Sequence, residues 1–168
     1  EYFDVADNVI CMVEYVPKDV TNAAKDIAKK YTAERKQEGG EEFGNIRKRV
    51  PKADSFDPRK GKRDVKISAK GLHSIAFGTH SIDLGSVEQL VHISQTRAIG
   101  DATHYATRKM GEESSIEAII TSVMDDVGKH GLDVLSQRPV GDYAGFRSFE
   151  LASAMNRLRT LSVESMEP

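Results

Sequence analysis

The spacing of apolar and polar positions changes along this chain, and each change predicts a different element. Residues 9–13 are almost continuously apolar, which is typical of a strand buried on both faces, as in the parallel sheet of an α/β protein. After Pro17, apolar positions recur at helical spacing over residues 23–31, with Asp19 or Thr21 as the capping residue. One such strand cannot form a sheet alone, so we expect the chain to be the C-terminal part of a longer protein.

The middle of the chain is irregular before it becomes periodic again. Residues 37–63 carry little apolar periodicity and are too long for an ordinary connection, so they are either a functional loop or a disordered segment. Apolar and polar residues alternate over residues 65–84, with Gly71 and Gly78 at the expected turns, which predicts a small antiparallel meander.

Helical periodicity dominates the last third of the chain. It predicts helices over about residues 94–110, 116–127 and 148–161, followed by a frayed tail over 162–168. The middle helix has the clearest amphipathic pattern, and Ser114 with Glu117 predicts a capping box at its start. The predicted fold class is therefore α/β for the protein as a whole and α+β within this chain.

Composition indicates the class of protein and its compartment but identifies no reaction or ligand. The 168 residues are 39% hydrophobic and 30% charged, enough for one compact domain with a core plus a loose segment. No stretch approaches a membrane span, so no membrane partner is predicted. The single cysteine, Cys11, cannot form an intramolecular disulfide and is expected to be a buried strand residue. We expect an intracellular, soluble protein of the cytoplasm or mitochondrion.

Charge is distributed unevenly along the chain, although the net charge is only −2. Residues 44–70 carry ten Lys/Arg against three Asp, a balance of +7. The preceding residues have a balance of −4, and the following ones a balance of −5. A basic middle between acidic flanks indicates a polyanion partner for the middle.

This basic segment is the main positive signal for a binding site. Its cations repel one another, and a nucleic-acid backbone would relieve that repulsion with strong salt dependence. Few stacking groups accompany them, which favours backbone contact over base readout. A solvated linker remains the alternative. The candidate nucleic-acid-binding residues are Arg47, Lys48, Arg49, Lys52, Arg59, Lys60, Lys62 and Arg63.

No catalytic motif stands by itself in the sequence. It has no Gly-x-x-x-x-Gly-Lys-Ser/Thr loop, no Gly-x-Gly-x-x-Gly and no His-Glu-x-x-His. Its five histidines lack metal-ligand spacing, so no catalytic or metal residue is named. Arg97 and Asp101, four residues apart, are expected to form an ion pair on a helix surface.

Several short segments, in order along the chain, carry a family resemblance. They are Tyr2-Phe3-Asp4-Val5-Ala6-Asp7-Asn8-Val9-Ile10, Pro17-Lys18-Asp19-Val20-Thr21, Arg47 with Val50-Pro51, Gly71-Leu72, Phe77-Gly78, Ile82-Asp83-Leu84, Val87-Glu88-Gln89-Leu90-Val91, Ser94-Gln95-Thr96-Arg97-Ala98-Ile99 and Ala154-Met155-Asn156-Arg157-Leu158-Arg159. Together they resemble the predicted ATPases of the ABC class, proteins with an ABC-type nucleotide-binding core and additions of their own. The resemblance covers nearly the whole chain.

The resemblance implies a domain organisation. Residues 1–36 would be the last strand and helix of the nucleotide-binding core, and 37–63 a basic flexible loop. Residues 64–161 would form a C-terminal domain of β-meander and helices, before the tail at 162–168. The phosphate-binding loop, the signature loop and the Mg-site strand would all lie upstream. The intact protein would then use ATP and Mg, whereas this chain alone is expected neither to bind nor to hydrolyse ATP.

The resemblance also implies partners. ABC-type sites are completed across a two-fold axis, so the intact protein is expected to be a homodimer, and the remainder of its own chain is a further partner. Some family members are associated with RNA, which favours single-stranded RNA or another nucleic acid at the basic segment. The alternative is a non-catalytic structural or dimerisation module with an incidental basic linker. The polar motif positions Glu88, Gln89, Gln95 and Arg97 could form a buried network, lie at a subunit interface or approach a nucleotide.

Overall fold

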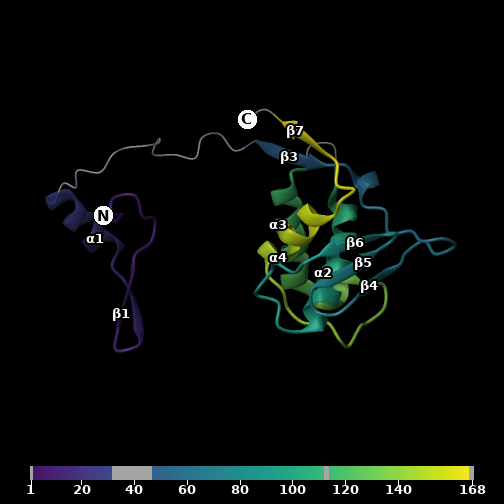
Figure 1. Cartoon of the computed structure of the whole chain (residues 1–168), viewed down its shortest axis with the longest axis horizontal. Helices are drawn as coiled ribbons and strands as arrows, with labels where there is room; N and C mark the ends of the chain where they lie inside the picture. The colour runs from purple at the N-terminus through teal and green to yellow at the C-terminus, as the bar shows by residue number, and fades with distance from the viewer. Residues whose placement is uncertain (1, 32–46, 112–113, 167–168) are drawn as a thin grey trace. The chain divides into compact units, whose positions relative to one another are not determined.

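The structure, a computed structural model, describes residues 2–31, 47–111 and 114–166. The chain divides into two compact units, residues 1–46 and 47–168, each of which is described by itself. Helices and small antiparallel sheets are both present, so the predicted mixed α and β fold class is confirmed (Figure 1). Within the described ranges, none of the helices has the length and apolar character needed to cross a membrane.

The first unit contains a β-hairpin followed by a helix. Strand β1 (Ile10–Val13) pairs antiparallel with β2 (Val16–Asp19), and α1 spans Thr21–Lys30. Glu14 and Tyr15 form the turn between the strands, and both have positive φ, 49° and 65°. Positive φ at both central positions is the pattern of a type I′ turn, which normally takes Asn or Gly. The turn therefore suits the twist of the hairpin but strains these two residues.

Hydrogen bonds to Asp19 and Thr21 connect the hairpin to the start of α1. The Asp19 carboxylate accepts from the Thr21 N–H at 2.9 Å and from its hydroxyl at 2.6 Å, and these bonds lower the pKa of Asp19. The Thr21 oxygen in turn accepts from the Val9 N–H at 2.9 Å. The N-cap of α1 is Val20, which makes no side-chain cap, so the prediction of Asp19 or Thr21 as the capping residue is wrong, although Asp19 accepts from the first N–H of the helix.

The prediction of a strand buried on both faces is wrong for β1. All four of its residues are exposed, including Cys11, and β1 lies in an antiparallel hairpin rather than a parallel sheet. Among the residues described in this unit, only Ala24 is buried. A continuous apolar run shows that a segment can be buried, but burial also requires a layer on each side, and this unit provides none in its described part.

The predicted meander forms the sheet of the second unit. Strands β4 (Ile67–Ala69), β5 (Ser74–Phe77) and β6 (His80–Asp83) pair antiparallel in the order β4-β5-β6. Ile75, Phe77 and Ile82 are fully buried, because alternate residues of β5 and the inward residue of β6 face the core.

Three α-helices complete the core: two of them contact this sheet, and the middle one in sequence packs on the other two and on the segment Lys48–Pro51. They are α2 (Ile93–Ala106), α3 (Ile116–His130) and α4 (Ser148–Arg157), with short 3₁₀ turns η1 (Ala53–Ser55), η2 (Thr107–Lys109) and η3 (Leu132–Leu135). Helix α2 contacts β4, β5, α3 and α4, which makes it the central element (Figure 1). The predicted capping box is wrong, because the N-cap is Ser115, whose side chain accepts from the Ala118 N–H at 3.2 Å, and Ala118 has no side-chain acceptor to complete a box.

Small residues allow α2 to pack closely against its neighbours. Ala98, Ala102 and Ala106 have no exposed surface. A Cβ added at Gly100 would lie 3.0 Å from the Ile67 side chain and 3.1 Å from that of Ile75. Gly100 thus allows close helix-to-sheet packing, whereas Ala98, Ala102 and Ala106, four residues apart, share a different face of the helix.

A second, two-stranded sheet joins distant parts of the second unit. Strand β3 (Lys48–Pro51) pairs antiparallel with β7 (Val163–Met166), with Pro51 opposite Val163, and the two lie side by side in Figure 1. The Lys52 N–H extends the pairing to the Ser162 carbonyl at 2.9 Å. The sequence predicts a loop at the first position and a frayed tail at the second. Both strands were missed because each is four residues long and its partner lies more than a hundred residues away.

Candidate nucleic-acid interface

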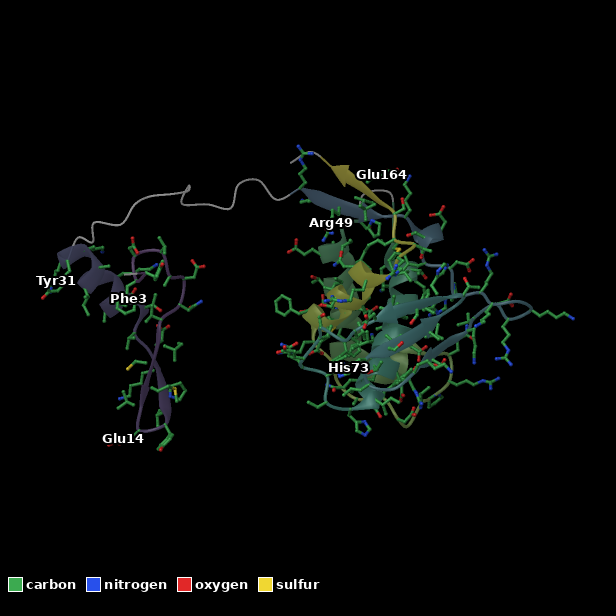
Figure 2. All side chains as sticks on the ribbon, in the orientation of Figure 1. Phe3, Glu14, Tyr31, Arg49, His73 and Glu164 are labelled. Atoms are coloured by element: carbon green, nitrogen blue, oxygen red, sulfur yellow. The ribbon has the colours of Figure 1, made fainter. Side chains whose placement is uncertain are left out.

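The structure separates the candidate cations into two groups. Arg47, Lys48 and Arg49 lie at the start of β3, where Figure 2 labels Arg49, Lys52 directly follows the strand, and all four are exposed. The cations from Arg59 to Arg63 lie on a projecting hairpin, residues 58–66, which we call the basic arm (Figure 1). Residues 37–46 of the predicted loop fall outside the described residues.

The tip of the basic arm is a tight turn. The Lys60 N–H donates to the Arg63 carbonyl at 3.0 Å, and the Arg63 N–H donates to the Lys60 carbonyl at 3.2 Å. Gly61 has a φ of +61°, while Lys62 keeps a negative φ. Positive φ at the first central residue alone is the pattern of a type II′ turn, which requires glycine there. The sequence Gly61-Lys62 therefore fixes a two-residue hairpin turn.

The base of the arm is attached to the meander. The Lys66 N–H donates to the Pro58 carbonyl at 2.9 Å, and the Gly78 N–H donates to the Lys66 carbonyl at 2.8 Å. A Cβ added at Gly78 would lie 2.5 Å from the Asp57 carbonyl oxygen and 2.9 Å from that of Arg59. This close backbone contact holds the arm in a defined direction relative to the core.

Two of the eight candidate cations are already engaged by acids. The Arg59 guanidinium donates to both Asp57 carboxylate oxygens, at 2.8 and 3.0 Å, and this pairing lowers the pKa of Asp57. The Lys52 ammonium lies 2.7 Å from the Glu164 carboxylate, which raises the pKa of Lys52 and links β3 to β7. These two cations have structural partners that the sequence pattern did not reveal.

The other six candidate cations have no acidic partner among the described residues. They are Arg47, Lys48, Arg49, Lys60, Lys62 and Arg63, and all are exposed. Phe56, the aromatic residue of residues 44–70, is 2% exposed and belongs to the core. It cannot stack on a base, so the surface is chemically suited to phosphate contact.

Two of the four polar motif positions, Gln95 and Arg97, brace the second unit. The Gln95 side-chain oxygen accepts from the Val91 and His92 N–H groups at 2.9 and 3.1 Å, and its amide donates to the Gly145 carbonyl at 3.0 Å. Glu88 and Gln89 are exposed, so they are not part of a buried network. Gln95 thus both caps α2 and connects it to the loop before α4.

The expected pair between Arg97 and Asp101 is wrong. Arg97 pairs with Asp142 on the loop before α4, and the Asp101 carboxylate accepts from the Tyr143 hydroxyl at 2.6 Å. Neighbours four apart on a helix have other partners here because the loop lies across this face of α2. Sequence reasoning missed Asp142 and Tyr143, whose only signal was their place in a Gly- and Pro-punctuated stretch.

Burial shifts the pKa values of Asp101, Tyr143 and His104. Desolvation raises the pKa of Asp101, against the opposing effect of the Tyr143 hydrogen bond. Desolvation and the Asp101 partner raise the pKa of Tyr143, and desolvation followed by Arg108 lowers the pKa of His104. These shifts follow from packing the loop before α4 on α2.

The hollow at the start of α1 does not fit a nucleotide. It is lined by Asp7, Asn8, Asp19 and the first residues of the helix. The Asp19 carboxylate is already occupied by Thr21, and two carboxylates would repel a polyphosphate. Within the described ranges, no group of three or more His, Cys, Asp or Glu side chains is placed to hold a metal ion.

Comparisons with known proteins agree with the two-unit organisation. The P-loop domain of the ABC ATPase family matches residues 1–49, which confirms the resemblance to ABC-class ATPases. A search of curated proteins found no significant match. The MRB1590 C-terminal domain matches residues 66–164, a span that includes the meander and all three helices of the second unit. Because this match covers more than half of the sequence, the chain belongs to the family of the MRB1590 C-terminal domain.

Proposed function

We propose that this chain is the C-terminal region of an ABC-class ATP-binding protein that acts on RNA or another nucleic acid. Its part in that function is to contact the nucleic-acid backbone through the six exposed cations of β3 and the basic arm. The observation that carries this proposal is that none of the described acids pairs with these cations, although Asp57 and Glu164 neutralise Arg59 and Lys52 close by. Cations left unpaired beside paired ones favour an external anion.

Phosphate contact predicts a specific dependence on salt. Each phosphate neutralised on a single strand contributes about −0.7 to the slope of log K against log salt. Because Phe56 is buried, stacking adds little, and binding should depend weakly on base sequence.

In this proposal, ATP and Mg belong to the nucleotide-binding core of the intact protein. P-loop ATPases use a nucleotide and Mg, but the hollow beside α1 carries carboxylates where phosphates need donors and cations. This chain alone is therefore expected neither to bind nor to hydrolyse ATP. The intact protein would act as a homodimer in which nucleotide-driven motion repositions the basic surfaces of two subunits around a strand.

A structural or dimerisation module is the second candidate. It is favoured by the first unit, where Ile10, Met12, Tyr15 and other large apolar side chains are exposed. Such a surface is suited to association, and a hairpin with one helix is marginally stable without a partner. In this reading the basic arm is incidental.

One experiment separates the two functions. Binding of the 168-residue chain to single-stranded RNA is measured by fluorescence anisotropy at about 50 and 200 mM salt, with self-association followed by sedimentation. Binding that weakens steeply with salt supports the nucleic-acid function. Concentration-dependent dimerisation without RNA affinity would overturn it in favour of the structural module.

A further inference from the structure

The tip of the basic arm places two like charges directly opposite each other. Lys60 and Arg63 form an isolated antiparallel bridge, closed by hydrogen bonds of 3.0 and 3.2 Å in both directions. Residues directly opposite in an antiparallel pair project their side chains to the same face, with Cβ atoms about 5 Å apart. Like charges in this arrangement destabilise a hairpin, so the pair is unfavourable unless an anion lies between its members.

No acid of the described chain relieves this repulsion. Asp57 is held by both oxygens on Arg59, and Asp64, next to Arg63, forms no ion pair with either tip cation. Asp64 acts on Arg59 electrostatically. The acids near the arm therefore stabilise its base and leave the tip positive.

The turn makes the arrangement geometrically defined. Gly61, at a φ of +61°, closes the smallest hairpin loop, and nothing lies within 4 Å of a Cβ added there. Contact of Gly78 with the backbone of Asp57 and Arg59 holds the base. Two cationic side chains on one face of an anchored turn are suited to hold one tetrahedral anion between them.

We propose that Lys60 and Arg63 form a clamp for a single phosphodiester of single-stranded RNA, an inference that rests on the proposed nucleic-acid function. Arg63 donates its planar fork to the phosphate oxygens and Lys60 contributes a point charge from the opposite strand. Lys62 lies at the outer end of the turn and adds general attraction. Arg59 and Lys52 take no part, because their acids already hold them.

If both side chains hold the same phosphate, the effects of removing each charge on the salt dependence of RNA binding should not add up in the double variant. The slope of log K against log salt is measured for the whole chain and an oligouridine of about 12 nucleotides. The slope should fall by about 0.7, the value for one phosphate, in Lys60→Gln, in Arg63→Gln and in the double variant. The fall in the double variant should be no larger than the fall in either single variant. The matched control, Lys129→Gln with Arg138→Gln, removes two exposed cations elsewhere and should leave the slope unchanged.

The outcomes distinguish this inference from the function on which it rests. If the unaltered chain binds RNA but the slope of log K against log salt falls by about 1.4 in the double variant, the two cations hold separate phosphates and the clamp is wrong. An unchanged slope in the double variant would also overturn the clamp, while the nucleic-acid function would survive through β3. If the unaltered chain does not bind RNA at all, both proposals fail.

Discussion

At the scale of single residues, the hydrogen bond from Tyr143 to Asp101 attaches a loop to a helix. The 2.6 Å hydrogen bond holds the loop before α4 on the face of α2, beside the pair of Arg97 with Asp142. A carboxylate in this half-buried position is costly when charged, which is why its pKa is raised. The cost is offset by the Tyr143 hydroxyl and, more weakly, by His104 and Arg97.

Replacing Asp101 by Asn should therefore change the pH dependence of stability. The folded pKa of Asp101 is above its unfolded value of 3.8, so its stabilising contribution is present below that pH and is lost as the pH rises through the folded pKa. An Asn cannot ionise and still accepts from Tyr143. We expect Asp101→Asn to gain stability relative to the unaltered chain between about pH 4 and 7, measured by urea unfolding.

The control removes the hydrogen bond instead of the charge. Tyr143→Phe leaves the Asp101 carboxylate without its donor and should cost about 1–2 kcal/mol at neutral pH. A stability difference between Asp101→Asn and the unaltered chain that does not change with pH would contradict the assignment of Asp101 as a desolvated carboxylate.

At the scale of elements, the attachment of the basic arm depends on one glycine. Gly78 has a φ of +60°, and any Cβ there would meet the Asp57 carbonyl oxygen at 2.5 Å, a backbone atom that cannot move cheaply. We expect Gly78→Ala to destabilise the chain by about 2 kcal/mol and to weaken RNA binding by displacing the arm. Urea unfolding and RNA anisotropy measure the two effects.

The same substitution at Gly128 is the matched control. Gly128 lies inside α3, and nothing approaches its added Cβ within 4 Å. Because Ala is a better helix former, Gly128→Ala should stabilise the chain by about 0.5–1 kcal/mol and leave RNA binding unchanged. Equal effects of the two substitutions would show that Gly78 is not a close-contact position.

The exposure of β1 gives a chemical test in the first unit. Cys11 is the only cysteine of the chain and lies on the exposed hairpin. We expect it to react with a thiol reagent in native buffer at a rate close to that in denaturant. Slow labelling that becomes slower as the protein concentration rises would instead show that association covers this hairpin.

Local signals decided which elements the sequence could predict. The meander and α3 were predicted because alternation and helical periodicity are properties of neighbouring residues. The pairing of β3 with β7 was not, because it depends on residues more than a hundred positions apart. Ser115 displaced Ser114 as the cap of α3, which shows that the pattern locates a helix end only to within a residue or two.

At the scale of the whole molecule, sequence and structure contributed different parts of the candidate site. Charge counting located the basic segment, because ten cations against three acids is visible in one dimension. It could not divide the cations into engaged and available ones, since Glu164 reaches Lys52 only through the β3–β7 pairing. The resemblance to ABC-class ATPases is confirmed, yet the motif residues Gln95 and Arg97 proved to brace α2 against its loop.

The exposed cations of β3 and the basic arm are proposed to bind a nucleic-acid backbone. The most direct test is the affinity of the 168-residue chain for single-stranded RNA after reversing the charge of five residues: Arg47, Lys48, Arg49, Lys60 and Arg63. We predict a loss of at least about tenfold at about 0.1 M salt, with a shallower salt slope, while reversal of Lys129 and Arg138 has little effect. Unchanged affinity in the five-residue variant would contradict the claim and leave the chain a structural module.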